Sequence, residues 1–332
     1  MIARLLFILC AMLFAWPAAR ADSCTASMPN ISFGNVSPIA GIDYTTSGTL
    51  RVTCTWTLAN LGIVLFPNVS VCVSAGVGSA GTSIAARAMA SGSARLPFNL
   101  YRDNSYAASS IWGATSTPGT APVNTTMGGL LAIGSLNSLF TVYGKIPAIS
   151  LAGVTTSNGA ETVYTSSFAG AGTIHYAFYG ALQAPVACTS GQSNAFLFDV
   201  QASVTNACDI DTTTLAFGTN IGLLNGAVRA QSTITVKCTA GNPYQISLDG
   251  GSVAGNPLAR KMRKGSGGAL VGYELSNTLD GAAWGDGTQG TIMQSGTGTG
   301  ASQAVQVYGR VPAQTTPVPG EYRDTVTATV YF

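Results

Sequence analysis

Charged residues are scarce in this sequence: Asp, Glu, Lys and Arg together make up 8% of its 332 residues, against about 25% in a typical soluble domain. Fifteen basic residues stand against thirteen acidic ones, so the chain lacks the basic surface that holds the phosphates of nucleic acids. We therefore expect no nucleic-acid partner. With so little surface charge, electrostatic repulsion does little to keep molecules of the protein apart from one another or from other surfaces. This suits a protein that is part of an assembly or adheres to a surface.

The residues that carry most enzyme chemistry are also few. The sequence has one histidine, His175, and no Cys-x-x-Cys pair, so we expect neither a metal site nor a cofactor. It shows no nucleophile motif and no acid–base constellation, and we interpret the chain as non-enzymatic. Residues 76–81 fit the pattern Gly-x-Gly-x-x-Gly, but no strand–helix–strand unit surrounds them, so a glycine-rich hairpin is the preferred interpretation.

No apolar run reaches the roughly 20 residues that a membrane-spanning helix needs. The run Leu5–Trp16 follows Arg4 and precedes the small-residue segment Ala19–Ala21. This order is typical of a secretory signal peptide. We predict that residues 1–21 are removed, that the protein is exported, and that the mature chain starts at Asp22 with thirteen basic and thirteen acidic residues.

Six cysteines remain in the mature chain, and an even number in an exported protein predicts disulfides. Cys24 and Cys54 are 30 residues apart, and Cys208 and Cys238 are also 30 residues apart. The equal spacing supports one bridge within each pair. The predicted disulfides are therefore Cys24–Cys54, Cys208–Cys238 and, from the two cysteines that remain, Cys72–Cys188.

The equal spacing belongs to an internal repeat. Phe-Gly stands nine residues after the first cysteine of each pair, and Met-x-x-Gly, Trp-Gly and Tyr-Gly-x-x-Pro follow in the same order in both halves. Ordered landmarks of this kind indicate two homologous domains, which we place at residues 22–205 and 206–332. The matching residues are Phe33 and Phe217, Met89 and Met262, Trp112 and Trp284, and Tyr143 and Tyr308.

Helical periodicity is nearly absent, and we expect one helical turn, at Ala85–Met89. Short alternating runs rich in Val, Ile, Thr, Tyr and Phe are separated by Gly, Pro, Asn and Ser. This pattern predicts an all-β protein of two tandem immunoglobulin-like β-sandwich domains. The strands expected in the first domain are Ile31–Phe33, Gly48–Trp56, Val69–Ala75, Leu96–Tyr101, Leu139–Lys145, Thr173–Gly180 and Phe196–Val204.

The last of these strands has no expected counterpart in the second domain. Phe196–Val204 alternates strictly, so burial of its five apolar side chains contributes on the order of 10 kcal/mol before ordering costs. The last strand expected in the second domain is Thr325–Phe332, which matches Thr173–Gly180. A six-stranded sandwich of this kind leaves an apolar groove that a strand from a partner completes. The residues predicted at this groove and strand are Val326, Ala328, Val330 and Phe332.

The Cys…Phe-Gly…Cys opening, the Met-x-x-Gly turn, the Trp-Gly pair and the Tyr-Gly-x-x-Pro segment resemble the spore coat protein U domain. This is also the pilin domain of archaic chaperone–usher pili, and two such domains behind a signal peptide resemble the two-domain tip subunits of Csu-type pili. The resemblance implies a periplasmic chaperone that lends a strand to the second domain. It also implies an outer-membrane usher that exchanges this strand for the N-terminal strand of the adjacent pilus subunit.

The position within the pilus is suggested by the start of the mature chain. A shaft subunit needs a donor strand before its first domain, whereas only Asp22 and Ser23 precede Cys24 after the expected cleavage. We therefore expect a subunit that accepts a strand but donates none. This places the protein at the pilus tip on the cell surface, with a role in attachment and biofilm formation.

Three regions of the first domain carry apolar insertions relative to the second. They are the loop between the second and third expected strands, the region between the fourth and fifth, and the loop between the sixth and seventh. In an immunoglobulin-like sandwich these connections share one pole, which here faces away from the second domain, and an exposed apolar patch there indicates binding to hydrophobic surfaces. The candidate residues are Leu61, Ile63, Val64, Leu65, Phe66, Leu130, Leu131, Ile133, Pro185 and Val186.

Two other interpretations remain open. Each insertion, taken alone, favours packing into the core over exposure, and only the three together favour adhesion. Buried insertions would favour a structural pilus or spore-coat subunit without an adhesive role. A lectin-like tip that binds glycan requires a cleft of aromatic and polar side chains, for which Trp112, Tyr101 and Tyr106 are candidates. The basic run Arg260–Lys264 is interpreted as a solvated loop, with contact to the chaperone or a neighbouring subunit as the weaker alternative.

Overall fold

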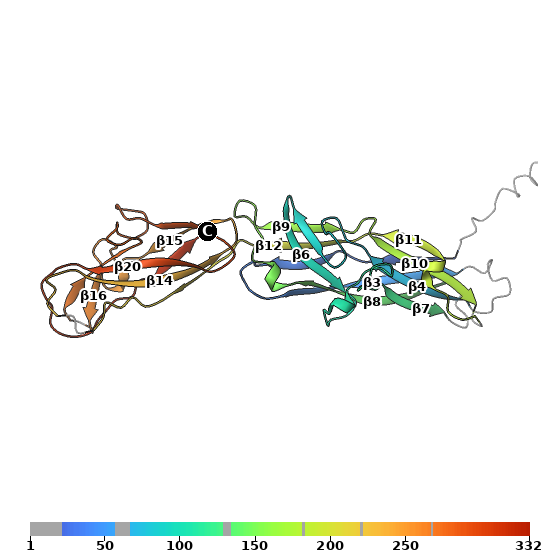
Figure 1. The fold of residues 1–332 in the computed structure, drawn as a ribbon, viewed down its shortest axis with the longest axis horizontal. Coiled ribbons are helices and arrows are strands. Elements are labelled where there is room, and N and C mark those ends of the chain that lie inside the picture. The colour runs from blue at the N-terminus through green and yellow to red at the C-terminus, as the bar shows by residue number, and fades with distance from the viewer. Residues whose placement is uncertain (1–21, 57–66, 129–133, 181–182, 220–221, 267) are drawn as a thin grey trace, which may run out of the picture.

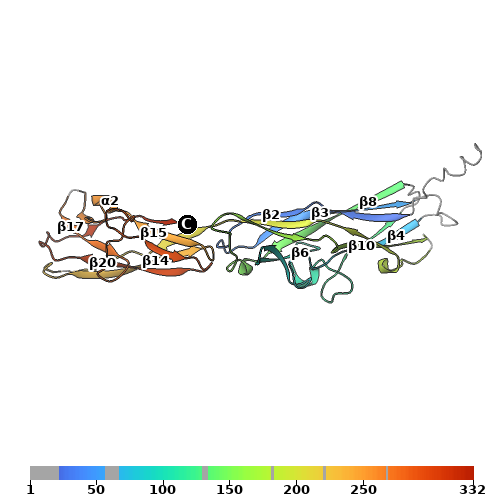
Figure 2. The same ribbon diagram turned by 90° about the horizontal axis from the view of Figure 1, so that it is seen from above.

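The computed structural model describes residues 22–56, 67–128, 134–180, 183–219, 222–266 and 268–332. In Figures 1 and 2 the described chain forms an elongated molecule in which two β-sandwiches lie end to end. Strands dominate both sandwiches, as the alternating sequence predicts. Within these ranges, no helix combines the length and the apolar character needed to cross a membrane.

The first sandwich packs an eight-stranded sheet on a four-stranded one. Its strands are β1 (Ser23–Ser27), β2 (Ile31–Val36), β3 (Tyr44–Trp56), β4 (Pro67–Ala75), β5 (Arg87–Ser91), β6 (Ala94–Tyr101), β7 (Val123–Gly128), β8 (Gly134–Ile146), β9 (Thr162–Ser167), β10 (Gly172–Gly180), β11 (Gln192–Phe196) and β12 (Asp199–Val204). The larger sheet has the order β1-β3-β8-β6-β5-β9-β12-β2, and the smaller has β11-β10-β4-β7. Short 3-10 helices connect some of them: η2 (Ala108–Ser110), η3 (Ala148–Ser150) and η4 (Cys188–Ser190).

Strands are present at all seven positions predicted for the first domain. The predicted strand Phe196–Val204 is divided, however: β11 ends at Phe196, β12 begins at Asp199, and Leu197 between them is 70% exposed. The break does not disturb the predicted inward face. All five apolar residues of the alternation, Phe196, Phe198, Val200, Ala202 and Val204, are buried.

The helical turn predicted at Ala85–Met89 is wrong, because this segment leads into β5. Strand β5 pairs with β6 in a tight hairpin whose register joins Ser91 to Ala94. Gly92 occupies the turn with φ of 57°, a conformation that favours glycine and that two-residue hairpin turns require. The pairing along the hairpin therefore overrides the weak local helical preference.

Strand β12 completes the core of the first sandwich. It pairs antiparallel with β9 and parallel with β2. The Phe198 ring stacks on Phe168 with centroids 4.4 Å apart and on Trp112 with centroids 5.9 Å apart. Strand β12 thus joins the edges of β9 and β2. Phe198, just before this strand, completes an aromatic stack in the core.

The second sandwich is smaller. Its strands are β13 (Cys208–Thr212), β14 (Val228–Cys238), β15 (Pro243–Leu248), β16 (Lys261–Lys264), β17 (Leu270–Gly272), β18 (Glu274–Ser276), β19 (Gln294–Thr297), β20 (Gln303–Val311), β21 (Tyr322–Arg323) and β22 (Ala328–Tyr331). They form three sheets in the orders β13-β14-β20-β18, β19-β15-β22 and β17-β16-β21. The only described α-helix is the single turn α2 (Gly251–Ala254). The core of this sandwich is centred on Trp284, Val236 and Ile246.

The three predicted disulfides are all present. Cys24–Cys54 joins directly paired residues of β1 and β3, and Cys208–Cys238 joins β13 and β14 in the same way. Cys72–Cys188 ties β4 to η4 across 116 residues. In the chain-entropy account, each short bridge contributes about 3–4 kcal/mol and the long one about 5 kcal/mol, because they restrict the unfolded chain.

The two sandwiches contact each other through polar groups. The buried Asn242 donates from Nδ2 to Thr156 Oγ1 at 2.6 Å and to Asn206 Oδ1 at 2.7 Å. Lys237 Nζ donates to the carbonyl oxygen of Ile39 at 2.7 Å. These bonds join the end of the first sandwich to the start of the second and are consistent with the extended arrangement in Figure 1.

Candidate strand groove and distal pole

A buried arginine stands at the same place in both sandwiches. Arg87 donates from Nε to Gly76 O at 2.8 Å and from Nη2 to the carbonyls of Ala75 and Trp112, both at 2.6 Å. Its Nη1 also donates to Asn99 Oδ1 at 2.7 Å. Burial lowers the pKa of this guanidinium from its ordinary value, so the four hydrogen bonds are what make the charge tolerable inside the protein.

Arg260 makes the equivalent network. It donates to the carbonyls of Leu248, Asp249 and Trp284 at 3.1, 2.6 and 2.7 Å from Nη2. The interpretation of Arg260–Lys264 as a solvated loop is therefore wrong: Arg260 is 1% exposed, and Lys261–Lys264 form strand β16, in which only Lys261 is exposed. Sequence reasoning missed both arginines, although each stands two residues before the Met landmark of its repeat.

These networks fix which residues of the two sandwiches correspond. The indole nitrogen of Trp112 donates to Val73 O at 2.8 Å, and that of Trp284 donates to Ile246 O at 2.8 Å. Strand pairing shows that β21 corresponds to β9. In the first sandwich, Thr165 of β9 pairs with Ala90 of β5, three residues after Arg87. In the second, Arg323 of β21 pairs with Arg263 of β16, three residues after Arg260. Tyr322 is thereby the counterpart of Tyr164, one residue earlier in each strand.

The side chains that surround β12 in the first sandwich are more buried than their counterparts in the second sandwich. In the first sandwich, four residues that surround this strand are at most 9% exposed, whereas each counterpart in the second sandwich is only partly buried. We call the four in the second sandwich the apolar groove. The pairs are Ile31 and Leu215, Phe33 and Phe217, Met89 and Met262, and Tyr164 and Tyr322.

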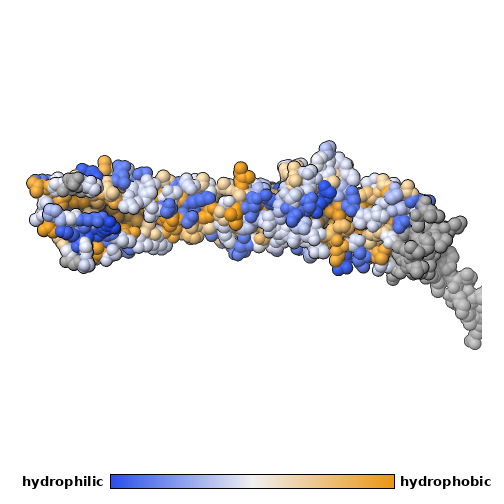
Figure 3. Space-filling model, turned by 90° about the horizontal axis from the view of Figure 1, so that it is seen from below, coloured by the Kyte–Doolittle hydropathy of each residue, from blue (hydrophilic) through white to orange (hydrophobic). Residues whose placement is uncertain are grey.

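No strand in the described part of the second sandwich lies where β12 lies in the first. Strand β21 pairs with β16 alone, whereas β9 pairs with both β5 and β12. Leu215–Phe217, which corresponds to the start of β2, belongs to no described strand. Figure 3 shows a hollowed apolar band on this sandwich. The exposed side chains and the unpaired edges occur together, as expected where one strand is lacking.

The predicted C-terminal strand is present but shorter. Strand β22 covers Ala328–Tyr331, against the predicted Thr325–Phe332, and pairs with β15. Val326, Ala328 and Val330 pack partly buried against the second core, while the residues between them are exposed, so the predicted alternation is confirmed for these three residues and not for Phe332. Phe332 lies beyond the strand and is 56% exposed.

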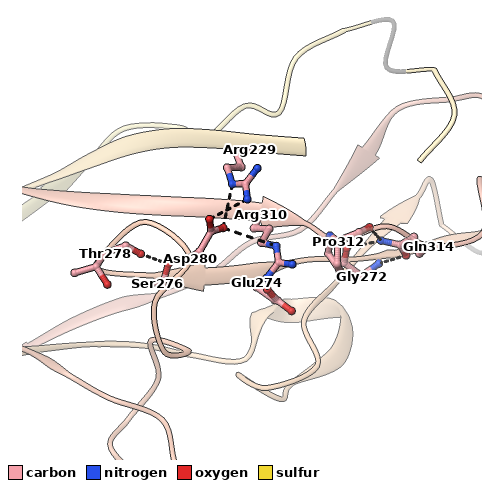
Figure 4. A network of polar contacts seen from close by, with 9 residues as sticks. All are labelled: Arg229, Gly272, Glu274, Ser276, Thr278, Asp280, Arg310, Pro312 and Gln314. Atoms are coloured by element: carbon pink, nitrogen blue, oxygen red, sulfur yellow. Dashed lines mark hydrogen bonds and ion pairs between the residues drawn. The ribbon is translucent and has the colours of Figure 1, made fainter. Parts of the chain in front are cut away.

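A cluster of charged side chains lies on β14, β20, β18 and the loop that follows β18, and its members are paired with one another (Figure 4). Arg229 on β14 bonds Asp280 through two nitrogens at 3.0 and 2.9 Å. Arg310 on β20 reaches Glu274 on β18 at 3.3 Å. The hydrogen bond from Arg229 lowers the pKa of the Asp280 carboxyl. Because exposed ion pairs of this kind contribute little stability, we assign the cluster no binding role.

The ends of five strands of the first sandwich, β3, β4, β7, β8 and β10, lie together at the pole away from the second sandwich (Figure 1). Trp56 at the end of β3 pairs with Gly134 at the start of β8. Pro67 at the start of β4 pairs with Gly180 at the end of β10, and Gly128 at the end of β7 pairs with Asn68. The three connections that carry the apolar insertions therefore leave from neighbouring strand ends. We call this region the distal pole.

Most of the predicted adhesive residues cannot be placed on the fold. Leu61, Ile63, Val64, Leu65, Phe66, Leu130, Leu131 and Ile133 lie outside the described residues. Pro185 and Val186 are described, and both are exposed. The predicted signal peptide, residues 1–21, also lies outside the described ranges.

The aromatic residues considered for a lectin-like cleft are placed differently from one another. Trp112 is fully buried in the core, so it is not available to a ligand. Tyr101 and Tyr106 lie together, with ring centroids 5.4 Å apart in an edge-to-face contact. Tyr143, used only as a repeat landmark in the sequence, joins them at 6.4 Å from Tyr106. In the described ranges, no group of three or more His, Cys, Asp and Glu residues could hold a metal ion.

The fold and the disulfides define a class: a tandem β-sandwich protein in which one disulfide joins the opening strand of each repeat to the long strand that it pairs with. The family model of the Spore Coat Protein U domain matches residues 11–169 and 194–329. The chain belongs to this family. A search of curated protein sequences found no significant match.

Solved structures with a similar fold come from bacterial adhesion systems. The crystal structure of the CsuC–CsuE chaperone–tip adhesion subunit pre-assembly complex of Acinetobacter baumannii includes a chain with TM-score 0.50 and 17% identity, covering 93% of this chain and 100% of that chain. The crystal structure of the CupB6 tip adhesin of Pseudomonas aeruginosa matches with TM-score 0.38 and 11% identity, covering 93% of this chain and 94% of that chain. At these identities the first similarity establishes the fold alone.

Proposed function

We propose that this protein is a non-enzymatic adhesive subunit of an archaic chaperone–usher pilus, exported through the periplasm and displayed at the pilus tip. Its second sandwich accepts a strand from a periplasmic chaperone and later, at the outer-membrane usher, from the N-terminal extension of the adjacent subunit. Its first sandwich attaches the pilus to hydrophobic surfaces through the distal pole. Membership of the Spore Coat Protein U family and the fold shared with the CsuE chain support this proposal.

One observation carries the proposal: the same fold is closed by its own strand in one sandwich and lacks that strand in the described part of the other. Four apolar side chains that are buried around β12 have partly exposed counterparts in the apolar groove. Covering them with an added strand supplies both apolar burial and main-chain hydrogen bonds, which is how β-augmentation obtains its affinity. A strand donor is therefore the partner whose chemistry suits the groove.

The chaperone step is tested by co-expression with the cognate periplasmic chaperone. We expect a soluble 1:1 complex, and we expect aggregation or degradation of the chain produced without it, because an unpaired edge is an aggregation hazard. The double variant Leu215→Asp/Tyr322→Asp puts carboxylates in the apolar groove and should abolish capture. Leu279→Asp changes a residue that is 60% exposed and outside the core cluster, and it should be captured normally. Equal capture of both variants would exclude the groove as the docking site.

The adhesive role is tested by replacing apolar residues of the distal loops in assembled pili. The combined substitution of Ile63, Leu65, Leu131, Ile133 and Val186 by Ser should reduce retention on polystyrene by more than about tenfold, because the loss of as little as 1.4 kcal/mol of contact energy has that effect. Retention is measured by counting cells that resist washing at a fixed flow.

The matched control replaces exposed apolar residues of the first sandwich that lie away from the distal pole: Ile42→Ser, Ile149→Ser and Val163→Ser. These side chains are 56%, 93% and 55% exposed, so their replacement removes free apolar surface without touching the loops. Cells with the control variant should adhere like the wild type. Equal losses in the two variants would mean that adhesion follows general surface hydrophobicity and not the distal pole.

A further inference from the structure

A small cleft lies on the flank of the first sandwich, away from the apolar groove. It has a volume of about 440 Å³ and opens between the loop that follows β6, the start of β7 and the outer face of β8. This volume falls within the range of small-molecule sites. The side chains that matter for its chemistry are Arg102, Asp103, Asn104, Asn124, Leu139 and Tyr143.

One wall of the cleft is apolar, and its aromatic ring is held in place. Tyr143 is edge-on to Tyr106, with centroids 6.4 Å apart at 87°, and Tyr106 is edge-on to the buried Tyr101 at 5.4 Å. Lys145 Nζ lies 5.5 Å from the centre of the Tyr106 ring. A ring fixed by neighbours on one side offers a ligand a platform with little ordering cost. Leu139, 57% exposed, extends the apolar wall along β8.

The opposite wall supplies hydrogen-bonding groups without a partner. Arg102 bonds the carbonyl of Ser109 from Nη2 at 3.0 Å, which holds its guanidinium beside the cleft; its Nε is shielded from solvent and is not available to a ligand. The amides of Asn104 and Asn124 are exposed and form no side-chain hydrogen bond with the described residues. Each amide offers both donors and an acceptor.

These properties together select a class of ligand. A pyranose ring has an apolar C–H face that fits an aromatic platform, and hydroxyl groups that both donate and accept hydrogen bonds. Asn amides and an Arg side chain can form hydrogen bonds with such hydroxyls. The positive charge of Arg102 is balanced by the negative charge of Asp103, so the lining of the cleft has no net charge. We infer that the cleft formed by Arg102, Asn124 and Tyr143 binds a neutral saccharide. The inference does not depend on strand donation or on the distal loops.

The test uses saturation-transfer difference NMR on the full chain, captured by its chaperone, with glucose, galactose, mannose and N-acetylglucosamine as probes. At least one sugar should show transfer to its ring protons. Tyr143→Ala removes the platform and Asn124→Ala removes an amide. Each should weaken binding by about 2–10-fold or more, the effect expected from one lost hydrogen bond or ring contact.

Two further variants make the result interpretable. Tyr143→Phe keeps the ring and its packing, so it should bind like the wild type. Ser135→Ala changes an exposed residue of β8 outside the cleft and should also leave binding intact. The inference is overturned if none of the four sugars shows transfer, or if transfer survives both Tyr143→Ala and Asn124→Ala unchanged. Either result leaves the strand groove and the distal loops to be judged by their own experiments.

Discussion

Replacing Arg87 by Met should lower the free energy of unfolding of the first sandwich by about 2–5 kcal/mol. A methionine side chain has no hydrogen-bond donor, so the carbonyls of Ala75, Gly76 and Trp112 lose the hydrogen bonds that Arg87 donates to them. Each buried acceptor left without a partner costs about 1–3 kcal/mol. Relief of the buried charge works in the opposite direction. Burial disfavours the charged guanidinium and lowers the pKa of Arg87, which is why we expect less than the sum of the four lost bonds.

The measurement is hydrogen exchange of the amides in β4, followed by mass spectrometry, because it reports the first sandwich separately from the second. Arg95→Met is the matched control. Arg95 lies in the same hairpin, and its hydrogen bonds to Gly92 O and Ala94 O are exposed, so the change should stay within about 0.5 kcal/mol. Equal protection of β4 in the two variants would show that the network adds nothing to stability.

Arg260 supplies an internal replicate of this experiment. Arg260→Met should reduce protection of β15 and leave β4 unchanged, because its acceptors Leu248, Asp249 and Trp284 all belong to the second sandwich. Lys261→Met is the exposed control. The repeat therefore separates a local role of each arginine from a general effect of losing positive charge.

The strands could be predicted from sequence because their signal is local. Alternation such as that of Phe196–Val204 states which side chains face the core, and the structure buries all five. The break at Leu197 could not be predicted in this way, because it depends on how β11 joins β10 while β12 joins β9 and β2. The predicted strand thus contributes β11 to one sheet and β12 to the other. The alternation of apolar residues does not indicate which strands lie beside it.

The buried arginines and the cleft were missed for a different reason. A charge in a basic run such as Arg260–Lys264 is normally solvated, and burial of Arg260 is made tolerable by backbone carbonyls that separate segments of the chain bring together. Tyr143 and Arg102 are 41 residues apart in the sequence and meet at the cleft through sheet pairing. The repeat gave a usable signal for the arginines, since both precede a Met landmark at the same spacing. For the cleft no comparable signal exists.

A copy of Phe196–Val204 attached after Phe332 through a Gly/Ser linker should stabilise the second sandwich and remove the chaperone requirement that we propose for it. The first sandwich dictates the register. Ala202 pairs with Tyr164 and Val200 with Ser166 in β9, so the copied Ala should lie opposite Tyr322 and the added strand should run antiparallel to β21. A net gain of about 3 kcal/mol would raise the Tm of a sandwich of this size by roughly 10 °C.

The control graft carries Asp in place of the copied Phe198 and Val200, which keeps length and linker but places charges where the core needs apolar side chains. It should leave the Tm unchanged and the chain still dependent on the chaperone. The stabilised graft should also resist capture, because its groove is already filled. If both grafts behave alike, the groove does not accept this strand in the register of β12. If the first graft gains stability but is still captured, the chaperone binds elsewhere on the second sandwich.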